Sequence, residues 1–151
     1  MMYLNSTVHK LTKIVVDLMF YGGILCLLAL PFLSRWIERY FCYGKGMLIP
    51  MLILLILSGL CAEYILFQLK CMFQSLKKGN PFIPQTVVRF RKMAVACAAI
   101  ALMYIVKLFI LFTVATVLII LIFAIGCLFC LTLKDLFKQA VLYKEENDLT
   151  I

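Results

Sequence analysis

The feature that most constrains this chain is the apolar stretch at residues 93–133, in which Lys107 is the only charged residue. A single helix of that length would measure roughly 60 Å, because each residue of an α-helix adds ~1.5 Å. The hydrocarbon core of a bilayer is only about 30 Å thick. The stretch therefore predicts two membrane spans, with a turn between them near residues 107–113.

The composition indicates that lipid covers much of the remaining chain as well. Hydrophobic residues make up 66% of the 151 residues, and charged residues make up 15%. A soluble domain has about 45–50% apolar and about 25% charged residues. We therefore expect one domain, over residues 1–151, that is embedded in the membrane.

Apolar runs of membrane-spanning length place four spans at residues 14–33, 47–69, 93–110 and 114–133. The predicted fold class is therefore all-α, an integral membrane four-helix bundle. Residues 70–92 are expected to form a polar loop between the second and third spans. Residues 134–151 are expected to form a polar tail.

Basic residues predict the orientation of these spans. With four spans, both termini lie on the same side of the membrane as the 70–92 loop, and that side holds eleven of the 15 lysine and arginine residues. Because basic residues are retained on the cytoplasmic side, both termini and the loop are expected in the cytoplasm. The net charge of +8 is then a topology signal, and direct nucleic-acid binding is not expected.

Two acidic residues, Asp17 and Glu63, fall inside the predicted spans. Ionisable groups within a span are costly and often mark ion or proton pathways. The span limits place both carboxylates at a similar depth, where they would share a proton, bind a cation or receive a basic group. A structural role is the alternative, because Lys13 lies one helical turn from Asp17 and Lys70 lies two turns from Glu63.

No residue set in the chain points to a reaction. The chain has one histidine and no cytosolic cysteine cluster, so a metal site is not expected. It contains no glycine-rich nucleotide-binding motif and no Ser/His/Asp set. Cys127 and Cys130 have C-x-x-C spacing, but they lie in an apolar span, where cysteine acts as a small hydrophobic residue. We expect no cofactor and no enzymatic activity.

Patterned polar sequence is concentrated on the predicted cytoplasmic side. In the loop, Gly79 and Pro81 interrupt a helix, and basic residues follow between apolar ones. In the tail, apolar residues recur at helical spacing, so the fourth span is expected to continue as a helix with one apolar stripe. The stripe consists of Leu133, Leu136, Phe137, Ala140 and Val141. Either the stripe is a docking surface for a soluble partner, or the acidic chain end and the basic loop attract each other.

Two motifs in these regions resemble a known family. The loop carries Gly79, Pro81 and Phe82, followed by Arg89 and Arg91, in a pattern similar to G-x-P-F…R-L-R-x-I. The tail ends with Lys144, Glu145, Glu146, Asn147, Asp148, Leu149, Thr150 and Ile151. Both motifs resemble those of the YoaS-like family, small four-span bacterial membrane proteins of unknown function.

The resemblance implies a location in the bacterial cytoplasmic membrane and a gene often found beside that of a small helix-turn-helix regulator. By that association we expect a non-enzymatic interaction or regulatory protein, which presents the loop and the tail to a cytosolic protein such as this regulator. The alternative is a small transporter or a proton- or ion-handling protein that uses Asp17 and Glu63. A homo-oligomer is left open, because Gly22, Gly23 and Gly126 would allow close helix contacts between copies.

Overall fold

The computed structural model describes residues 6–41, 45–77 and 84–149, and it describes side chains for residues 11–33, 49–75 and 84–147. Across the described ranges the secondary structure is four α-helices: α1 (Ser6–Phe41), α2 (Lys45–Lys77), α3 (Pro84–Ile110) and α4 (Val114–Leu149). Each helix contains an apolar segment long enough to cross a bilayer. The predicted all-α fold with four helices of membrane-spanning length is confirmed.

The helices are longer than the predicted spans. α2 runs from Lys45 to Lys77 and α4 runs from Val114 to Leu149, so both helices extend past the predicted spans. The predicted loop is helical at both ends, because α2 continues to Lys77 and α3 begins at Pro84. The break between α3 and α4 covers residues 111–113, inside the region in which the length argument places the turn.

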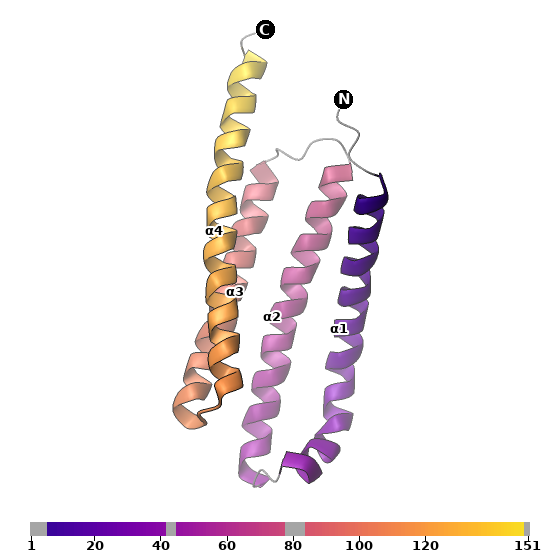
Figure 1. Cartoon of the computed structure of the whole chain (residues 1–151), viewed down its shortest axis with the longest axis vertical. Coiled ribbons are helices and arrows are strands. Elements are labelled where there is room, and N and C mark those ends of the chain that lie inside the picture. The colour runs from indigo at the N-terminus through magenta and orange to yellow at the C-terminus, as the bar shows by residue number, and fades with distance from the viewer. Residues whose placement is uncertain (1–5, 42–44, 78–83, 150–151) are drawn as a thin grey trace.

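The four helices do not close into the predicted bundle. α1 contacts α2, α2 contacts α3, and α3 packs most extensively on α4, whereas α1 and α4 make no contact in the described ranges. Figure 1 shows α1, α2 and α3 in a row, with α4 alongside α3 and both chain ends at the same end of the molecule. The array stays open because α1 packs on one neighbour and leaves its other faces to lipid.

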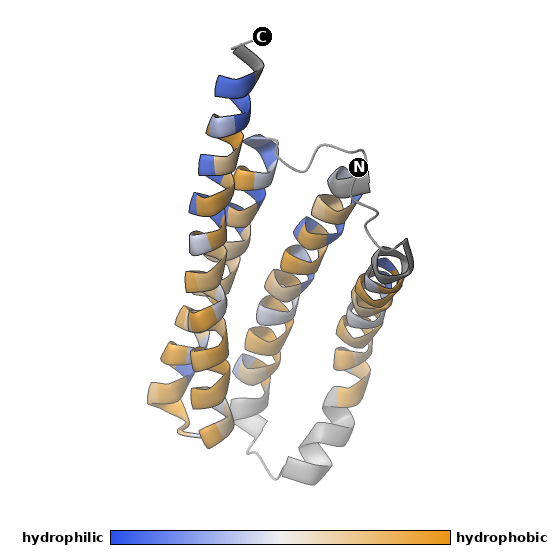
Figure 2. Ribbon diagram, turned by 45° about the horizontal axis from the view of Figure 1, so that its top comes forward, coloured by the Kyte–Doolittle hydropathy of each residue, from blue (hydrophilic) through white to orange (hydrophobic). Residues whose placement is uncertain are grey.

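The best-packed region lies between α3 and the later part of α4. Phe90, Met93, Ala94 and Cys130 are buried there, and Phe137 packs against them with its ring centroid 5.2 Å from that of Phe90. Elsewhere large apolar side chains face outward, as Phe109 does with 88% of its surface exposed. Figure 2 shows hydrophobic residues along all four helices and hydrophilic residues at the end of α4. This distribution is typical of a protein whose surroundings are as apolar as its interior.

Glycines determine how closely α1 approaches α2. A Cβ atom at Gly59 would overlap the side chain of Leu27, and a Cβ atom at Gly23 would overlap the carboxylate of Glu63. Gly22 faces open space, and a Cβ atom at Gly126 would make an ordinary contact of 3.8 Å with Cys97 Sγ. Gly23 and Gly59 therefore serve contacts within one chain, whereas α3 and α4 would accept a methyl group at residue 126.

Candidate functional site

Asp17 of α1 forms an ion pair with Lys70 of α2, with 2.9 Å between Asp17 Oδ1 and Lys70 Nζ. The Lys70 ammonium also lies 5.0 Å from the ring centroid of Phe20 and 4.8 Å from that of Tyr21. Sequence spacing suggested Lys13 as the partner of Asp17 and Lys70 as a partner of Glu63. The structure instead joins Asp17 and Lys70 across the two helices, and this contact links α1 to α2.

Glu63 lies deeper in the membrane segment than the Asp17–Lys70 pair. It precedes Lys70 on α2 by about 10 Å of helix, at ~1.5 Å per residue. Glu63 meets Gly23 of α1, six residues beyond Asp17, so the two carboxylates are offset along both helices. The expectation that Asp17 and Glu63 share one depth is therefore wrong, and the structure does not bring them together as a joint proton or cation site.

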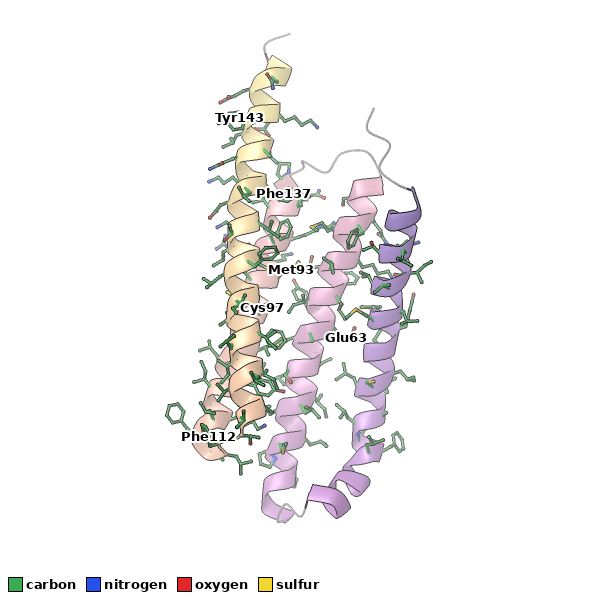
Figure 3. All side chains as sticks on the ribbon, in the orientation of Figure 1. Glu63, Met93, Cys97, Phe112, Phe137 and Tyr143 are labelled. Carbon is green, nitrogen blue, oxygen red and sulfur yellow. The ribbon has the colours of Figure 1, made fainter. Side chains whose placement is uncertain are left out.

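The carboxylate of Glu63 occupies the space between α1 and α2, where Figure 3 labels it. Its Oε1 atom lies against the backbone of Gly23, in the space that a larger residue would fill. Its Oε2 atom is buried and has no hydrogen-bond partner in the described part of the chain. Glu63 Oε2 is thus a buried acceptor that receives no hydrogen bond from the described residues.

Glu63 lines a cavity of about 440 Å³ to which all four helices contribute. The wall includes Gly23 and Leu27 of α1, Ser58 and Glu63 of α2, Tyr104 of α3, and Phe123 of α4. α1 and α4 both line the cavity but do not contact each other in the described ranges, so no helix contact closes the cavity between them. We call this space the Glu63 cavity.

A pair of hydroxyl groups forms a second polar feature of the Glu63 cavity. Ser58 Oγ donates to the carbonyl of Leu55 at 3.1 Å, and Ser58 Oγ and Tyr104 Oη lie 3.3 Å apart. With the Ser58 proton used in this way, the Tyr104 hydroxyl is the donor to Ser58. Sequence reasoning missed this pair. Small residues such as Ser58 and Gly59 amid large apolar ones were the available signal, because they mark close helix contacts in membranes.

Some residues of the predicted apolar stripe of the tail pack inside the molecule, and another is exposed. Leu133 and Phe137 pack against the Phe90 core, and Val141 is buried, whereas Leu136 is 56% exposed. The helix continuation is as expected, since α4 runs to Leu149. Most of the stripe packs on the chain's own core, so the docking surface predicted for it is reduced.

The last part of α4 projects beyond the start of α3 (Figure 1). Leu142 is 50% exposed and Tyr143 is 68% exposed, and the Glu145 and Glu146 side chains that follow are exposed as well. We define residues 142–149 as the α4 overhang. Of the predicted C-terminal motif, side chains are described through Asn147, Asp148 and Leu149 are described as backbone, and Thr150 and Ile151 lie outside the described residues.

The predicted loop motif is described only in its second half. Arg91 is exposed on α3, and Arg89 is half-buried, with its Nη1 atom lacking a hydrogen-bond partner within the described ranges. Gly79, Pro81 and Phe82 lie outside the described residues. The structure therefore places the basic half of the motif on the first turns of α3.

The described cysteines, at positions 26, 61, 71, 97, 127 and 130, are free thiols. Cys130 is buried in the α3–α4 core, and Cys127 packs beside it. The described residues contain no group of three or more His, Cys, Asp or Glu side chains that could hold a metal ion. The Glu63 cavity and the α4 overhang are thus two places in this part of the chain where polar side chains are positioned to meet a binding partner.

Residues 43–151 match a family described as "Protein of unknown function (DUF2975)". The matched segment contains α2, α3 and α4, and therefore Glu63 and both predicted motifs, whereas α1 and Asp17 lie outside it. This match supports the expectation that the chain belongs to a family of unknown function, and the YoaS-like resemblance stays a prediction. No curated protein and no solved structure matches the chain.

Proposed function

The chain belongs to the DUF2975 family of proteins of unknown function, and we propose that it is a non-enzymatic membrane protein whose α4 overhang binds a cytosolic protein. The proposed partner is a small helix-turn-helix regulator. The proposed location is the bacterial cytoplasmic membrane, as the resemblance to the YoaS-like family implies, and both termini are proposed to lie in the cytoplasm. The excess of basic residues at that end of the molecule supports this orientation.

The projection of α4 out of the membrane carries this proposal. A helix needs about 20 residues to cross the hydrocarbon core, so α4, which begins at Val114, leaves it near Lys134. The overhang begins about 12 Å beyond that point, at ~1.5 Å per residue. Leu142 and Tyr143 are thus exposed where lipid tails do not cover them and where the described part of the chain does not pack on them.

The chemistry of the overhang suits a basic partner. Glu145, Glu146 and Asp148 make the end of the helix acidic, and Tyr143 offers an aromatic ring of the kind that anchors protein interfaces. A DNA-binding regulator carries a basic surface, to which an acidic helix end is complementary. Binding at that surface would compete with DNA, which gives the membrane protein a way to hold the regulator inactive.

The test is recovery of the regulator encoded beside the gene, using the detergent-solubilised full chain as bait. We expect a chain that ends at residue 143 to lose this recovery. Tyr143→Ala is expected to weaken binding about tenfold or more, because an anchoring aromatic residue contributes ~2 kcal/mol.

Phe129→Ala is the matched control, because Phe129 is 63% exposed on the same helix but lies within the membrane segment. Its binding should equal that of the parent chain. Undiminished recovery with both the chain that ends at residue 143 and Tyr143→Ala would rule out the overhang as the binding site.

A further inference from the structure

The Glu63 cavity has the size of a small-molecule site. Its volume of about 440 Å³ lies within the range of about 300–1,000 Å³ that such sites occupy. It lies between the helices of a membrane protein, and no helix contact closes it between α1 and α4 in the described ranges. A ligand would therefore reach it from the bilayer and not from the water on either side.

The Glu63 carboxylate shows which group a ligand must bring, because it lines the cavity and its Oε2 atom has no hydrogen-bond partner in the described part of the chain. Burial of a carboxylate oxygen without a hydrogen-bond donor is costly, and the cost is larger in a membrane, where water does not supply the donor. Lys70, the nearest lysine along α2, is already paired with Asp17. A donor from a bound molecule would satisfy the Glu63 carboxylate.

The backbone of α1 is shaped to accommodate this carboxylate. A Cβ atom at Gly23 would overlap Glu63 Oε1, so any other residue at this position would push the carboxylate aside. A Cβ atom at the neighbouring Gly22 would meet nothing within 4 Å. The position of Glu63 thus depends on Gly23 and not on Gly22. Gly23→Ala and Gly22→Ala therefore form a matched pair of variants.

The rest of the wall shows what the body of a ligand must be. Leu27, Leu30 and Phe123 line the cavity with hydrocarbon, and the hydroxyl groups of Ser58 and Tyr104 already bond to each other. An apolar body therefore matches most of the wall, with one charged or donor group at Glu63. A hard metal ion does not match, because it needs six or more oxygen ligands and Glu63 is the only carboxylate in the wall.

We propose that the Glu63 cavity binds a small protonated amine carried on a compact apolar body, which enters from the bilayer between α1 and α4. The ammonium group donates to the carboxylate of Glu63 where it lines the cavity, and the apolar body fills the space between Leu27 and Phe123. The Asp17–Lys70 pair takes no part in binding. This proposal is independent of the partner proposed for the α4 overhang.

The test uses the full chain in lipid nanodiscs and radiolabelled 1-aminoadamantane as the probe. We expect saturable binding of one probe molecule per chain, above the binding to empty nanodiscs. The neutral analogue 1-adamantanol should compete at least about tenfold more weakly than unlabelled amine, because hydrogen bonds to charged groups contribute more than neutral ones. Equal competition by the amine and the alcohol would overturn the proposal, and this comparison needs no variant.

The variants then assign the site. Glu63→Gln and Gly23→Ala should each weaken binding of the amine, whereas Gly22→Ala and Asp17→Asn should leave it unchanged. Each variant is compared at equal amounts of monodisperse protein. Unchanged affinity in Glu63→Gln, or equal losses in Gly22→Ala and Gly23→Ala, would contradict the assignment to Glu63. If Glu63→Gln does not fold, the two glycine variants decide.

Discussion

At the scale of single residues, Asp17 and Lys70 show how a charge is kept inside an apolar helix pair. The two side chains meet at 2.9 Å, and the ammonium lies over two aromatic rings of α1. Both side chains are partly exposed on the apolar helix surface, and removing one partner leaves the other charge unpaired in that apolar environment, which is costly. The pair therefore contributes to holding α1 on α2, the one helix that α1 contacts in the described ranges.

The first prediction concerns this pair. Asp17→Asn and Lys70→Met should each lower the melting temperature in a fixed detergent, and the double variant should lose less than the sum of the two. Each single change leaves one unpaired charge, whereas the double change leaves none. Lys13→Met, one turn from Asp17, is the control and should have little effect. Strictly additive losses would show that the two residues do not interact.

At the scale of helices, the α3–α4 hairpin is the most firmly packed element pair. Phe90 is 3% exposed and lies in contact with side chains of both helices. In lipid, helix association depends on close packing more than on removal of apolar surface from water. The hairpin should therefore be sensitive to cavities and insensitive to changes on its lipid-facing surface.

The prediction at this scale is that Phe90→Ala destabilises the hairpin by about 3 kcal/mol, from the cavity that loss of the ring leaves. Phe109→Ala is the control, because Phe109 is 88% exposed and lies on the same helix. Reversible unfolding in mixed micelles measures both. A loss for Phe109→Ala as large as that for Phe90→Ala would contradict this account of the packing.

At the scale of the whole molecule, the open array places the start of α1, the end of α2, the start of α3 and the end of α4 at one end (Figure 1). The short α3–α4 turn lies at the other end. This arrangement gives the membrane protein two chemically distinct faces. The proposed orientation turns the face with most basic residues toward the cytoplasm.

The prediction for the whole molecule is a topology. A fluorescent protein fused after Ile151 should fluoresce, because it folds in the cytoplasm. Alkaline phosphatase inserted within residues 111–113 should be active, because it needs the oxidising periplasm. Activity of phosphatase fused after Ile151, with none at residues 111–113, would reverse the proposed orientation and remove the overhang from the cytoplasm.

Sequence alone determined that the chain is built to lie in lipid, that it forms four helices, and where the α3–α4 turn lies. These properties depend on the length and hydropathy of local segments, which a linear chain displays directly. It also marked Asp17 and Glu63 as costly residues, because a carboxylate in an apolar run is visible without a fold.

Only the tertiary structure decided which groups meet. Three contacts depend on the register between neighbouring helices. Asp17 pairs with Lys70, and Glu63 fits beside Gly23. Leu133 and Phe137 pack in the core. Lipid-facing and helix-facing residues are equally apolar, so hydropathy carries no signal for that register. The partner of each polar side chain and the cavity beside Glu63 therefore follow from helix packing, which the order of residues does not display.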